Sequence, residues 1–312
     1  MRKNRVVLQI KSGSNNHSSA PVQCREGVVV AHHGVAVDVS FDDGSRGSIR
    51  VKRKSGHVVG DTVQVAGEVL IRLERKTELR RQDAMGGIHL VGANLDVLGI
   101  VIASVPEPPE GFIERAVVAA RASGLMPFLV LNKLDLDGAD VFVSAVAARY
   151  GGLIPFFSVS SETGDGVDQI RRYLAEGHRA AFVGTTGVGK SSLVNVLCPD
   201  IFLRIGALNE HTGKGCHTTT VATLHRLPDG GEIVDTPGFN DFGLVDISAG
   251  ELSFYFPGFD HVRTERCRFR DCLHRSEPGC TVVDRVSRGL IPEHRYNAYM
   301  RLLEETKDSE KR

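Results

Sequence analysis

An eight-residue stretch, GTTGVGKS at residues 184–191, has the residue types of a phosphate-binding loop. It lies between a strand pattern and an amphipathic helix pattern and matches G-x4-G-K-S/T at Gly184, Gly189, Lys190 and Ser191. Glycines let successive backbone N–H groups converge on phosphate oxygens, and the following helix N-terminus favours negative charge. We expect Lys190 to neutralise the β- and γ-phosphates and Ser191 to ligate Mg²⁺. This loop alone does not distinguish ATP from GTP.

A second stretch, NKLD, has the residue types that recognise guanine. An ionised Asp135 can accept hydrogen bonds from the N1–H and N2–H₂ donors of guanine, Asn132 can bond the base, and Lys133 can lie along its face. Adenine lacks that donor pair. Sites that depend on such bonds reject a ligand without the donors by a factor of roughly 10⁴ to 10⁵. The later stretch SSETG is typical of a second base-contacting loop, with Ser160 and Ser161 under the guanine edge.

Two further segments suit a magnesium-dependent nucleotide switch. In GGEIVDTPGF, about 45 residues after the phosphate loop, Asp235 is placed to hold the Mg²⁺ shell and Gly238 to offer an N–H to the γ-phosphate. The intervening NEHTGKGCHTTT is rich in Gly and Thr, as expected of a mobile switch whose threonine reaches Mg²⁺ only while the γ-phosphate is present. Thr218 and Thr219 are both candidates for that ligand, and the sequence does not choose between them.

The residue that positions the attacking water is less evident. Many GTPases place a glutamine after D-T-P-G, but Phe239 occupies that position here and cannot orient water. His217 in the G-C-H-T segment can donate and accept hydrogen bonds, so it is our candidate. The alternative is a histidine that only packs or faces solvent.

Three cysteines and a histidine crowd together near the end of the chain. They form C-x4-C-x-H-x5-C, which supplies the four ligands of a closed, structural, tetrahedral Zn²⁺ site: Cys267, Cys272, His274 and Cys280. Metal binding on the order of 10 kcal/mol would help fold a segment too small to bury a core. Arginines and Phe269 are interleaved with these ligands and form either an RNA-facing surface or an ordinary solvated basic face.

The surrounding sequence divides into three parts that would position these motifs. Short β-rich runs over residues 6–69 predict a small barrel, with the OB fold a good candidate. From about residue 92, apolar strands alternate with helical segments, which predicts a mainly parallel sheet covered by helices. We therefore expect an OB-type domain at 1–81, a central α/β P-loop domain at 82–250 and a mostly helical zinc-binding domain at 251–312.

Composition indicates a soluble globular protein. Of the 312 residues, 41% are hydrophobic and 24% charged, and no apolar run approaches the roughly 20 residues of a membrane span. The first residues lack the apolar core of a signal peptide, so we expect a cytoplasmic protein, and we expect a monomer. Residues 1–81, 82–260 and 261–312 carry net charges of +7, −10 and +3. Basic ends suit contact with a polyanion, and ordinary solvated surface is the alternative.

The motif order is unusual, because NKLD precedes the phosphate loop. The order NKLD, SSETG, GTTGVGKS, HTTT and DTPGF, followed by CRFRDCLHRSEPGC, resembles the circularly permuted, ribosome-associated GTPases of the RsgA (YjeQ) family over nearly the whole chain. One departure is Thr186, where a serine often precedes the second loop glycine. We expect this change to be tolerated because the backbone does most of the binding.

That resemblance implies an N-terminal OB domain, a C-terminal zinc domain, and GTP hydrolysis stimulated by the small (30S) ribosomal subunit during late maturation. It also implies contact with ribosomal RNA and a water-positioning role for His217. A GTP-dependent RNA-binding module with incidental hydrolysis and a P-loop ATPase or kinase are the alternatives. The residues predicted to contact GTP are Asn132, Lys133, Asp135, Ser160, Ser161, Gly184, Thr185, Thr186, Gly187, Val188, Gly189, Lys190, Ser191, Ser192 and Gly238.

Permutation also shortens the path between two of these motifs. DTPGF runs within about 30 residues into the zinc segment. Joining the old termini is feasible because domain termini usually lie at the surface and near one another. We therefore expect the γ-phosphate-sensing switch to report to the C-terminal domain.

Overall fold

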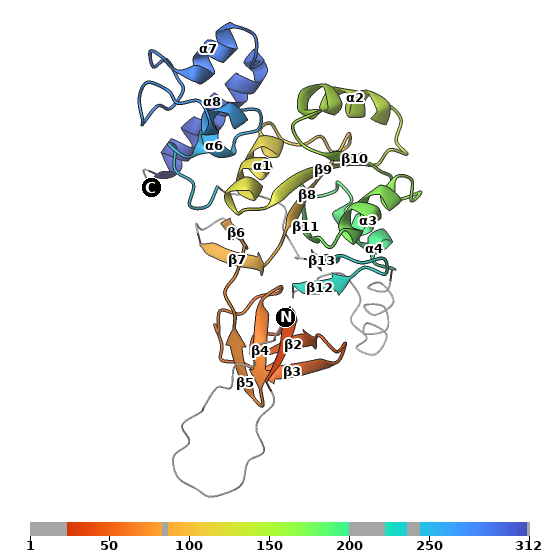
Figure 1. Ribbon diagram of the computed structural model, residues 1–312. Helices are drawn as coiled ribbons and strands as arrows, with labels where there is room; N and C mark the ends of the chain where they lie inside the picture. The colour runs from red at the N-terminus through yellow and green to blue at the C-terminus, as the bar shows by residue number, and fades with distance from the viewer. Residues whose placement is uncertain (1–23, 83–86, 200–221, 236–243, 311–312) are drawn as a thin grey trace, which may run out of the picture.

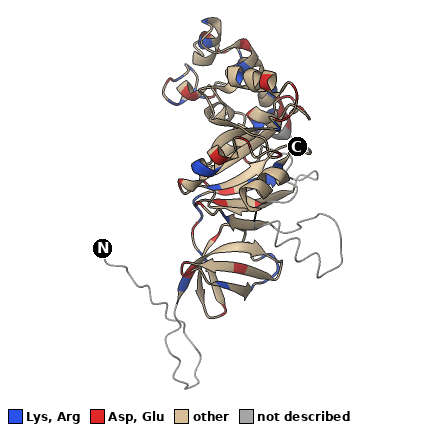
Figure 2. Ribbon diagram, turned by 90° about the vertical axis from the view of Figure 1, so that its right-hand side faces the viewer, with Lys and Arg blue, Asp and Glu red and all other residues tan. Residues whose placement is uncertain are grey.

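The structure is a computed structural model that describes residues 24–82, 87–199, 222–235 and 244–310. It is elongated: an N-terminal antiparallel sheet lies at one end, a helix-covered sheet in the middle and a helical C-terminal part at the other end (Figure 1). Basic positions occur at both ends and are interspersed with acidic ones (Figure 2). Four predicted site residues lie outside the described ranges: His217, Thr218, Thr219 and Gly238.

The N-terminal sheet consists of five antiparallel strands in the spatial order β3-β2-β1-β4-β5. Alternate residues of these strands form a small apolar core that includes Val29, Val39, Phe41 and Val63. Within the described residues no pairing joins β3 to β5, so a closed OB barrel is not shown and stays a prediction. The strands are β1 (Arg25–His32), β2 (Ala36–Phe41), β3 (Arg46–Arg50), β4 (Thr62–Ala66) and β5 (Val69–Arg72).

A hairpin follows this sheet and leads into the centre of the molecule. Strand β6 (Glu78–Gln82) pairs antiparallel with β7 (Ile88–Ala93) in a separate two-stranded sheet. The end of β7 is fixed to the N-terminal sheet, because the Ala93 N–H donates to the Val59 carbonyl at 3.0 Å. The end of the hairpin is therefore fixed to the N-terminal sheet.

The central sheet has the order β10-β9-β8-β11-β13-β12, and all neighbours are parallel except β12 and β13. This confirms the mainly parallel sheet that the alternating pattern predicted. A bridge from Ala31 to Thr223 joins β12 to β1, so the N-terminal and central sheets are continuous. The strands are β8 (Val97–Ala103), β9 (Met126–Asn132), β10 (Phe156–Ser158), β11 (Arg179–Val183), β12 (Thr223–Arg226) and β13 (Glu232–Asp235).

Helices cover both faces of the central sheet. Helices α1 (Phe112–Ala122) and α2 (Ala139–Tyr150) contribute to one apolar core, and α3 (Val167–Ala175) and α4 (Lys190–Leu197) to the other. Parallel strands bury both faces in this arrangement, and every residue of β8 is buried. The carboxyl ends of β9, β11 and β13 consequently meet at one edge of the sheet, where ligands of open α/β sheets bind.

The C-terminal part packs against α1. Its core contains the buried rings of Phe256, Phe259 and Tyr299, and Val118 of α1 joins that core. An ion pair of 2.6 Å between Arg115 and Glu305 adds to the contact. Its elements are α6 (Leu252–Tyr255), the 3₁₀ turn η1 (Asp260–Arg263), α7 (Thr281–Ser287) and α8 (Glu293–Glu310).

Among the helices that the structure describes, none combines the length and apolar character that crossing a bilayer requires.

Candidate nucleotide site and metal centre

The predicted phosphate loop connects β11 to the N-terminus of α4. Gly184 is pressed against β8, since a Cβ there would lie 2.3 Å from the Val101 carbonyl oxygen. Gly189 has a φ of +91°, and a Cβ on it would lie 2.3 Å from the Asn132 side-chain nitrogen. Both positions therefore require glycine. Val188 between them is fully buried and anchors the loop in the core.

Lys190 folds back over this loop. Its Nζ donates to the carbonyls of Gly184 at 2.6 Å and Thr185 at 3.0 Å. Burial lowers the pKa of Lys190, because desolvation disfavours the charged ammonium. A negatively charged phosphate nearby would oppose this effect and favour the charged form. Ser191 and Ser192 lie in the first turn of α4, directly after Lys190, and are exposed, as a ligand contact requires. The loop thus presents an ammonium group, two hydroxyls and a helix N-terminus at one place.

Asn132 links the base-reading strand to the phosphate loop. Its side chain is 2% exposed, and its Nδ2 donates to the Val188 carbonyl at 2.9 Å and to the Ser161 Oγ at 3.1 Å. Its Oδ1 accepts from the Ser161 N–H at 3.0 Å. These bonds hold the two nucleotide-facing loops together, and the predicted bond from Asn132 to the base stays a prediction.

Asp135 lies beside Ser160 at the same edge. Its Oδ1 accepts from the Ser160 hydroxyl at 2.5 Å, and Ser160 is 1% exposed. The Ser160 oxygen in turn accepts from the Thr163 N–H at 3.1 Å. Asp135 itself is exposed. Ser160 therefore positions the Asp135 carboxylate from beneath and leaves it accessible to the donors of a base.

Lys133 contacts a loop that sequence reasoning did not include in the site. Its backbone has a φ of +66°, and its Nζ donates to the Val105 carbonyl at 2.8 Å. Pro106 of that loop also borders the phosphate loop, within 3.6 Å of where a Cβ on Gly187 would lie. The stretch SVPEPPE carries no nucleotide-binding pattern. Only the strand order reveals that it ends beside NKLD.

Asp235 ends β13, the neighbour of β11 in the sheet. Burial raises its pKa, so a bound cation would stabilise the ionised carboxylate. The structure therefore brings together, at the carboxyl ends of three strands, the carboxylate predicted to read the base, the phosphate loop and a carboxylate suited to magnesium. The residues placed there are Asn132, Lys133, Asp135, Ser160, Ser161, Gly184, Thr185, Thr186, Gly187, Val188, Gly189, Lys190, Ser191, Ser192 and Asp235.

The four predicted metal ligands also come together. Their ligand atoms lie within 4.8 Å of one another. The His274 Nδ1 is 3.5 Å from the Cys267 Sγ, 3.6 Å from the Cys272 Sγ and 3.3 Å from the Cys280 Sγ. Tetrahedral zinc with Zn–S of ~2.3 Å and Zn–N of ~2.0 Å places neighbouring ligand atoms about 3.5 to 3.8 Å apart. The cluster therefore fits a zinc ion.

The electrostatics of the cluster also suit a bound cation. Burial raises the pKa of Cys272 and of Cys280, so a metal ion would compensate the cost of holding their thiolates. Burial lowers the pKa of His274, which keeps the imidazole neutral and able to coordinate. All three effects follow from desolvation in a buried site.

Three residues outside the ligand pattern hold the loop that carries His274, which has a φ of +59°. The Glu277 carboxylate accepts from the N–H groups of Leu273 at 2.9 Å and Arg275 at 2.7 Å. From α8, the Tyr299 hydroxyl donates to the Leu273 carbonyl at 3.1 Å and the Tyr296 hydroxyl to the His274 carbonyl at 2.9 Å. In the sequence, the i, i+3 spacing of Tyr296 and Tyr299 places both on one helix face, and this spacing was the signal that could have identified them as a pair.

Comparison with known proteins decides the family. The sequence pattern of the family described as RsgA GTPase matches residues 72–245, which is more than half of the chain. The chain belongs to the RsgA GTPase family. It is therefore a P-loop enzyme that hydrolyses GTP, which confirms the resemblance seen in the motif order.

Curated relatives extend the similarity beyond the GTPase region. A protein of Pseudomonas fluorescens (strain SBW25) is 39% identical over 292 residues, covering 89% of this chain and 84% of the relative. One from Azotobacter vinelandii is 38% identical over 317 residues, covering 97% and 90%. Both are named small ribosomal subunit biogenesis GTPase RsgA.

Solved structures agree with this family assignment. YjeQ from Thermotoga maritima superposes with a TM-score of 0.74 at 31% identity, covering 91% of this chain and 99% of that one. YloQ, described as a circularly permuted GTPase, superposes with a TM-score of 0.67 at 24% identity, covering 95% and 99%. The fold is therefore the permuted one that the position of NKLD before the phosphate loop predicted.

Proposed function

We propose that this GTPase binds the small (30S) ribosomal subunit, assists its late maturation in the cytoplasm and hydrolyses GTP with subunit-stimulated turnover. The observation that carries the proposal is the similarity to curated relatives named for small ribosomal subunit biogenesis over 84% to 90% of their length. Because the similarity includes the parts outside the GTPase region, it supports a shared partner as well as a shared reaction.

The nucleotide site supports a division of roles among its residues. Asp135 reads the guanine edge, supported by Ser160, while Asn132 and Ser161 hold the reading loop against the phosphate loop. The loop from Gly184 to Ser192 binds the phosphates, with Lys190 neutralising charge. Mg²⁺ is held by Ser191, Asp235 and one of Thr218 and Thr219. Gly238 contacts the γ-phosphate, and His217 positions water.

The two ends of the chain are proposed to contact ribosomal RNA. Zinc bound by Cys267, Cys272, His274 and Cys280 would fix a loop that exposes Arg266, Arg268, Phe269 and Arg270. The Arg268 guanidinium lies 5.7 Å from the centroid of the exposed Phe269 ring, an arrangement that offers both charge and stacking to a single-stranded base. The predicted N-terminal domain, residues 1–81, carries a net charge of +7 and would form a second basic contact with the RNA.

Co-sedimentation with purified 30S subunits tests the proposal. We expect the full-length protein to sediment with the subunits when loaded with a non-hydrolysable GTP analogue, and to dissociate progressively as salt is raised, because phosphate contacts release counterions. A variant in which Arg266, Arg268 and Arg270 are changed to Gln should bind more weakly and with a shallower salt dependence. Absence of nucleotide-dependent binding at low salt would contradict the proposal.

A further inference from the structure

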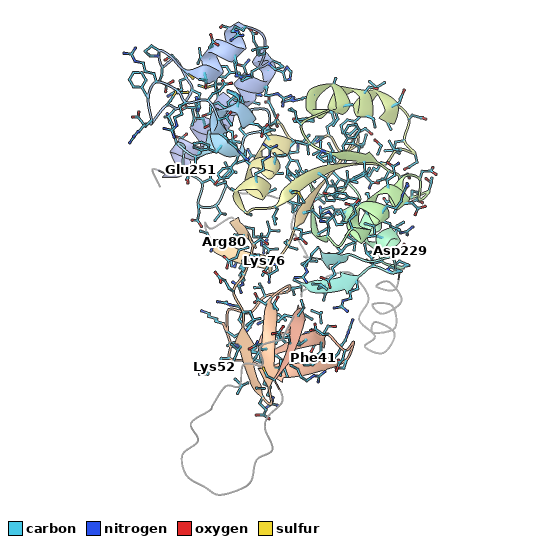
Figure 3. The ribbon with its side chains drawn as sticks, viewed as in Figure 1. Phe41, Lys52, Lys76, Arg80, Asp229 and Glu251 are labelled. Atoms are coloured by element: carbon cyan, nitrogen blue, oxygen red, sulfur yellow. The ribbon has the colours of Figure 1, made fainter. Side chains whose placement is uncertain are left out.

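Residues 73–82 comprise the link that leaves the N-terminal sheet and strand β6 of the hairpin, and we term them the strap. Lys76 and Arg80 of the strap lie between the N-terminal sheet and the C-terminal part, which begins near Glu251 (Figure 3). Within the strap, the Lys76 N–H donates to the Asn94 Oδ1 at 2.8 Å and the Thr77 hydroxyl to the Leu95 carbonyl at 2.6 Å. The middle of the strap is thus fixed to the start of the central sheet.

A buried ion pair fixes the strap to the N-terminal sheet. The Arg75 Nε and Nη2 donate to the two Asp61 carboxylate oxygens at 2.6 and 2.9 Å, and the Asp61 side chain is 0% exposed. The Asp61 Oδ2 also accepts from the Val58 N–H at 2.8 Å. Removing one partner of such a pair leaves a buried charge unpaired and is strongly destabilising, so we expect this contact to persist in the folded protein.

An exposed ion pair ties the other end of the strap to a different part of the chain. The Arg80 Nη1 donates to the Asp246 Oδ2 at 2.8 Å, with the side chains 45% and 62% exposed. Glu78 joins the two pairs, because it accepts from Arg75 at 2.9 Å and from Arg80 at 2.6 Å. Water solvates both ions of an exposed pair, which therefore contributes little to stability and can open without unfolding.

Asp246 follows the γ-phosphate-sensing motif closely. It lies eleven residues after Asp235 and eight after Gly238. Leu244 packs against both the central and the C-terminal cores, and Ile247 is buried in the C-terminal core. Packing thus holds the segment on either side of Asp246. A displacement of the γ-phosphate-sensing motif would be transmitted to Asp246 through a short length of chain.

A cavity next to this ion pair leaves room for such a displacement. It has a volume of about 310 Å³ and lies between the strap, the end of α1 and residues 245–247. Arg80 and Asp246 both line it, as do Ala119 and Tyr255. The Asp246 side chain can therefore move relative to Arg80 within this cavity while Leu244 and Ile247 stay packed in cores where small volume changes carry a cost.

We propose that Arg80 and Asp246 form a nucleotide-dependent clasp that reports the state of the GTP site to the N-terminal sheet. GTPases hold their switch loops through contacts to the γ-phosphate, and Gly238, eight residues before Asp246, is predicted to make such a contact. That contact would present Asp246 to Arg80, and the strap would pass the change through Glu78 and Arg75 to Asp61. The bridge between Ala31 and Thr223 provides a further contact of the N-terminal sheet, with strand β12. The clasp requires GTP binding but no ribosomal subunit.

Hydrogen exchange on the free, full-length protein tests the clasp. We expect exchange in residues 73–82 to be about threefold slower with a non-hydrolysable GTP analogue than with GDP, because the closed clasp protects the strap. Asp246→Asn and Arg80→Gln should each abolish this difference, and Asp246→Glu should retain it. GTP affinity should stay within about twofold in all three variants. The control is Asp284→Asn, which removes the exposed ion pair of Asp284 with Arg288.

Either of two results would overturn the proposed clasp and leave the proposed function unaffected. A strap that exchanges equally in both nucleotide states, or faster with the GTP analogue, would contradict it. So would a nucleotide-dependent difference that survives both Asp246→Asn and Arg80→Gln. Failure of the protein to bind ribosomal subunits would overturn the proposed function and leave this result unaffected, since no subunit is present.

Discussion

The Asn132 side-chain amide donates to the backbone carbonyl of Val188 at 2.9 Å and thereby connects the base-reading motif to the phosphate loop. The two residues are 56 positions apart, and in this permuted chain the base-reading motif comes first. The Asn132–Val188 contact is compatible with circular permutation because it requires only that the two strand ends are adjacent in the sheet. The order of those strands along the sequence does not affect it. Asn132 therefore acts on both halves of the nucleotide site.

Replacing Asn132 by Ala should destabilise the protein and weaken GTP and GDP binding together. Three hydrogen bonds are lost, and the half-buried Ser161 N–H and the buried Val188 carbonyl are left without this partner, so we expect a loss of about 2 to 4 kcal/mol in the free energy of unfolding. Denaturant unfolding measures this loss. The exposed Asp137→Ala in the same loop is the control. An Asn132→Ala protein as stable as the control would contradict the structural role.

Replacing Asp135 by Asn should exchange guanine for xanthine recognition. Xanthine carries a carbonyl where guanine carries the N2 amine, so the amide of Asn can donate to the base that the carboxylate would repel. We expect GTP affinity to fall by at least about 100-fold and XTP affinity to rise correspondingly. Competition binding with GTP, XTP and ATP measures both changes. Retained GTP preference in this variant would show that another residue reads the base.

Replacing Tyr299 by Phe should loosen the zinc loop without removing a ligand. Its hydroxyl donates to the Leu273 carbonyl beside His274, and the ring is fully buried, so Phe preserves the packing and removes only that bond. We expect bound zinc to remain stoichiometric but to transfer about tenfold faster to a chromogenic chelator, as outer contacts of metal ligands typically contribute 10- to 100-fold. Cys272→Ser should lose zinc outright. Equal release from Tyr299→Phe and the native protein would contradict the positioning role.

Replacing His217 by Ala should lower turnover and leave GTP affinity nearly intact. Phe239 cannot orient the attacking water, and a water-positioning residue acts in the transition state more than in the ground state. Single-turnover kinetics and equilibrium binding separate the two quantities. His217 lies outside the described residues, so its role stays a prediction. An unchanged subunit-stimulated rate would assign the water to another group.

The sequence predicted those features that depend on short motifs. The phosphate loop, NKLD and the metal ligands each lie within a few residues, and the alternating strands and helices led to the parallel sheet. Contacts such as Lys133 with Val105, Arg75 with Asp61 and Arg80 with Asp246 could not be predicted. Each joins segments whose proximity is set by the fold, and none has a local pattern.

The N-terminal sheet shows a similar limit. Short β-rich runs predicted its strands, but pairing between β3 and β5 would depend on long-range register, and the described residues do not show it. The expected coupling of the DTPGF switch to the C-terminal domain also stays a prediction. Because Asp246 bonds Arg80, the proposed clasp couples the DTPGF switch to the strap as well as to the C-terminal domain.

GTP turnover with and without purified 30S subunits tests the central claim most directly. We predict a slow intrinsic rate that rises by at least about tenfold with subunits, and a Lys190→Ala protein that hydrolyses slowly in both conditions because the developing phosphate charge is not neutralised. A rate that does not change on adding subunits, in protein shown to bind GTP and zinc, would contradict the account and identify a GTP-dependent RNA-binding module instead.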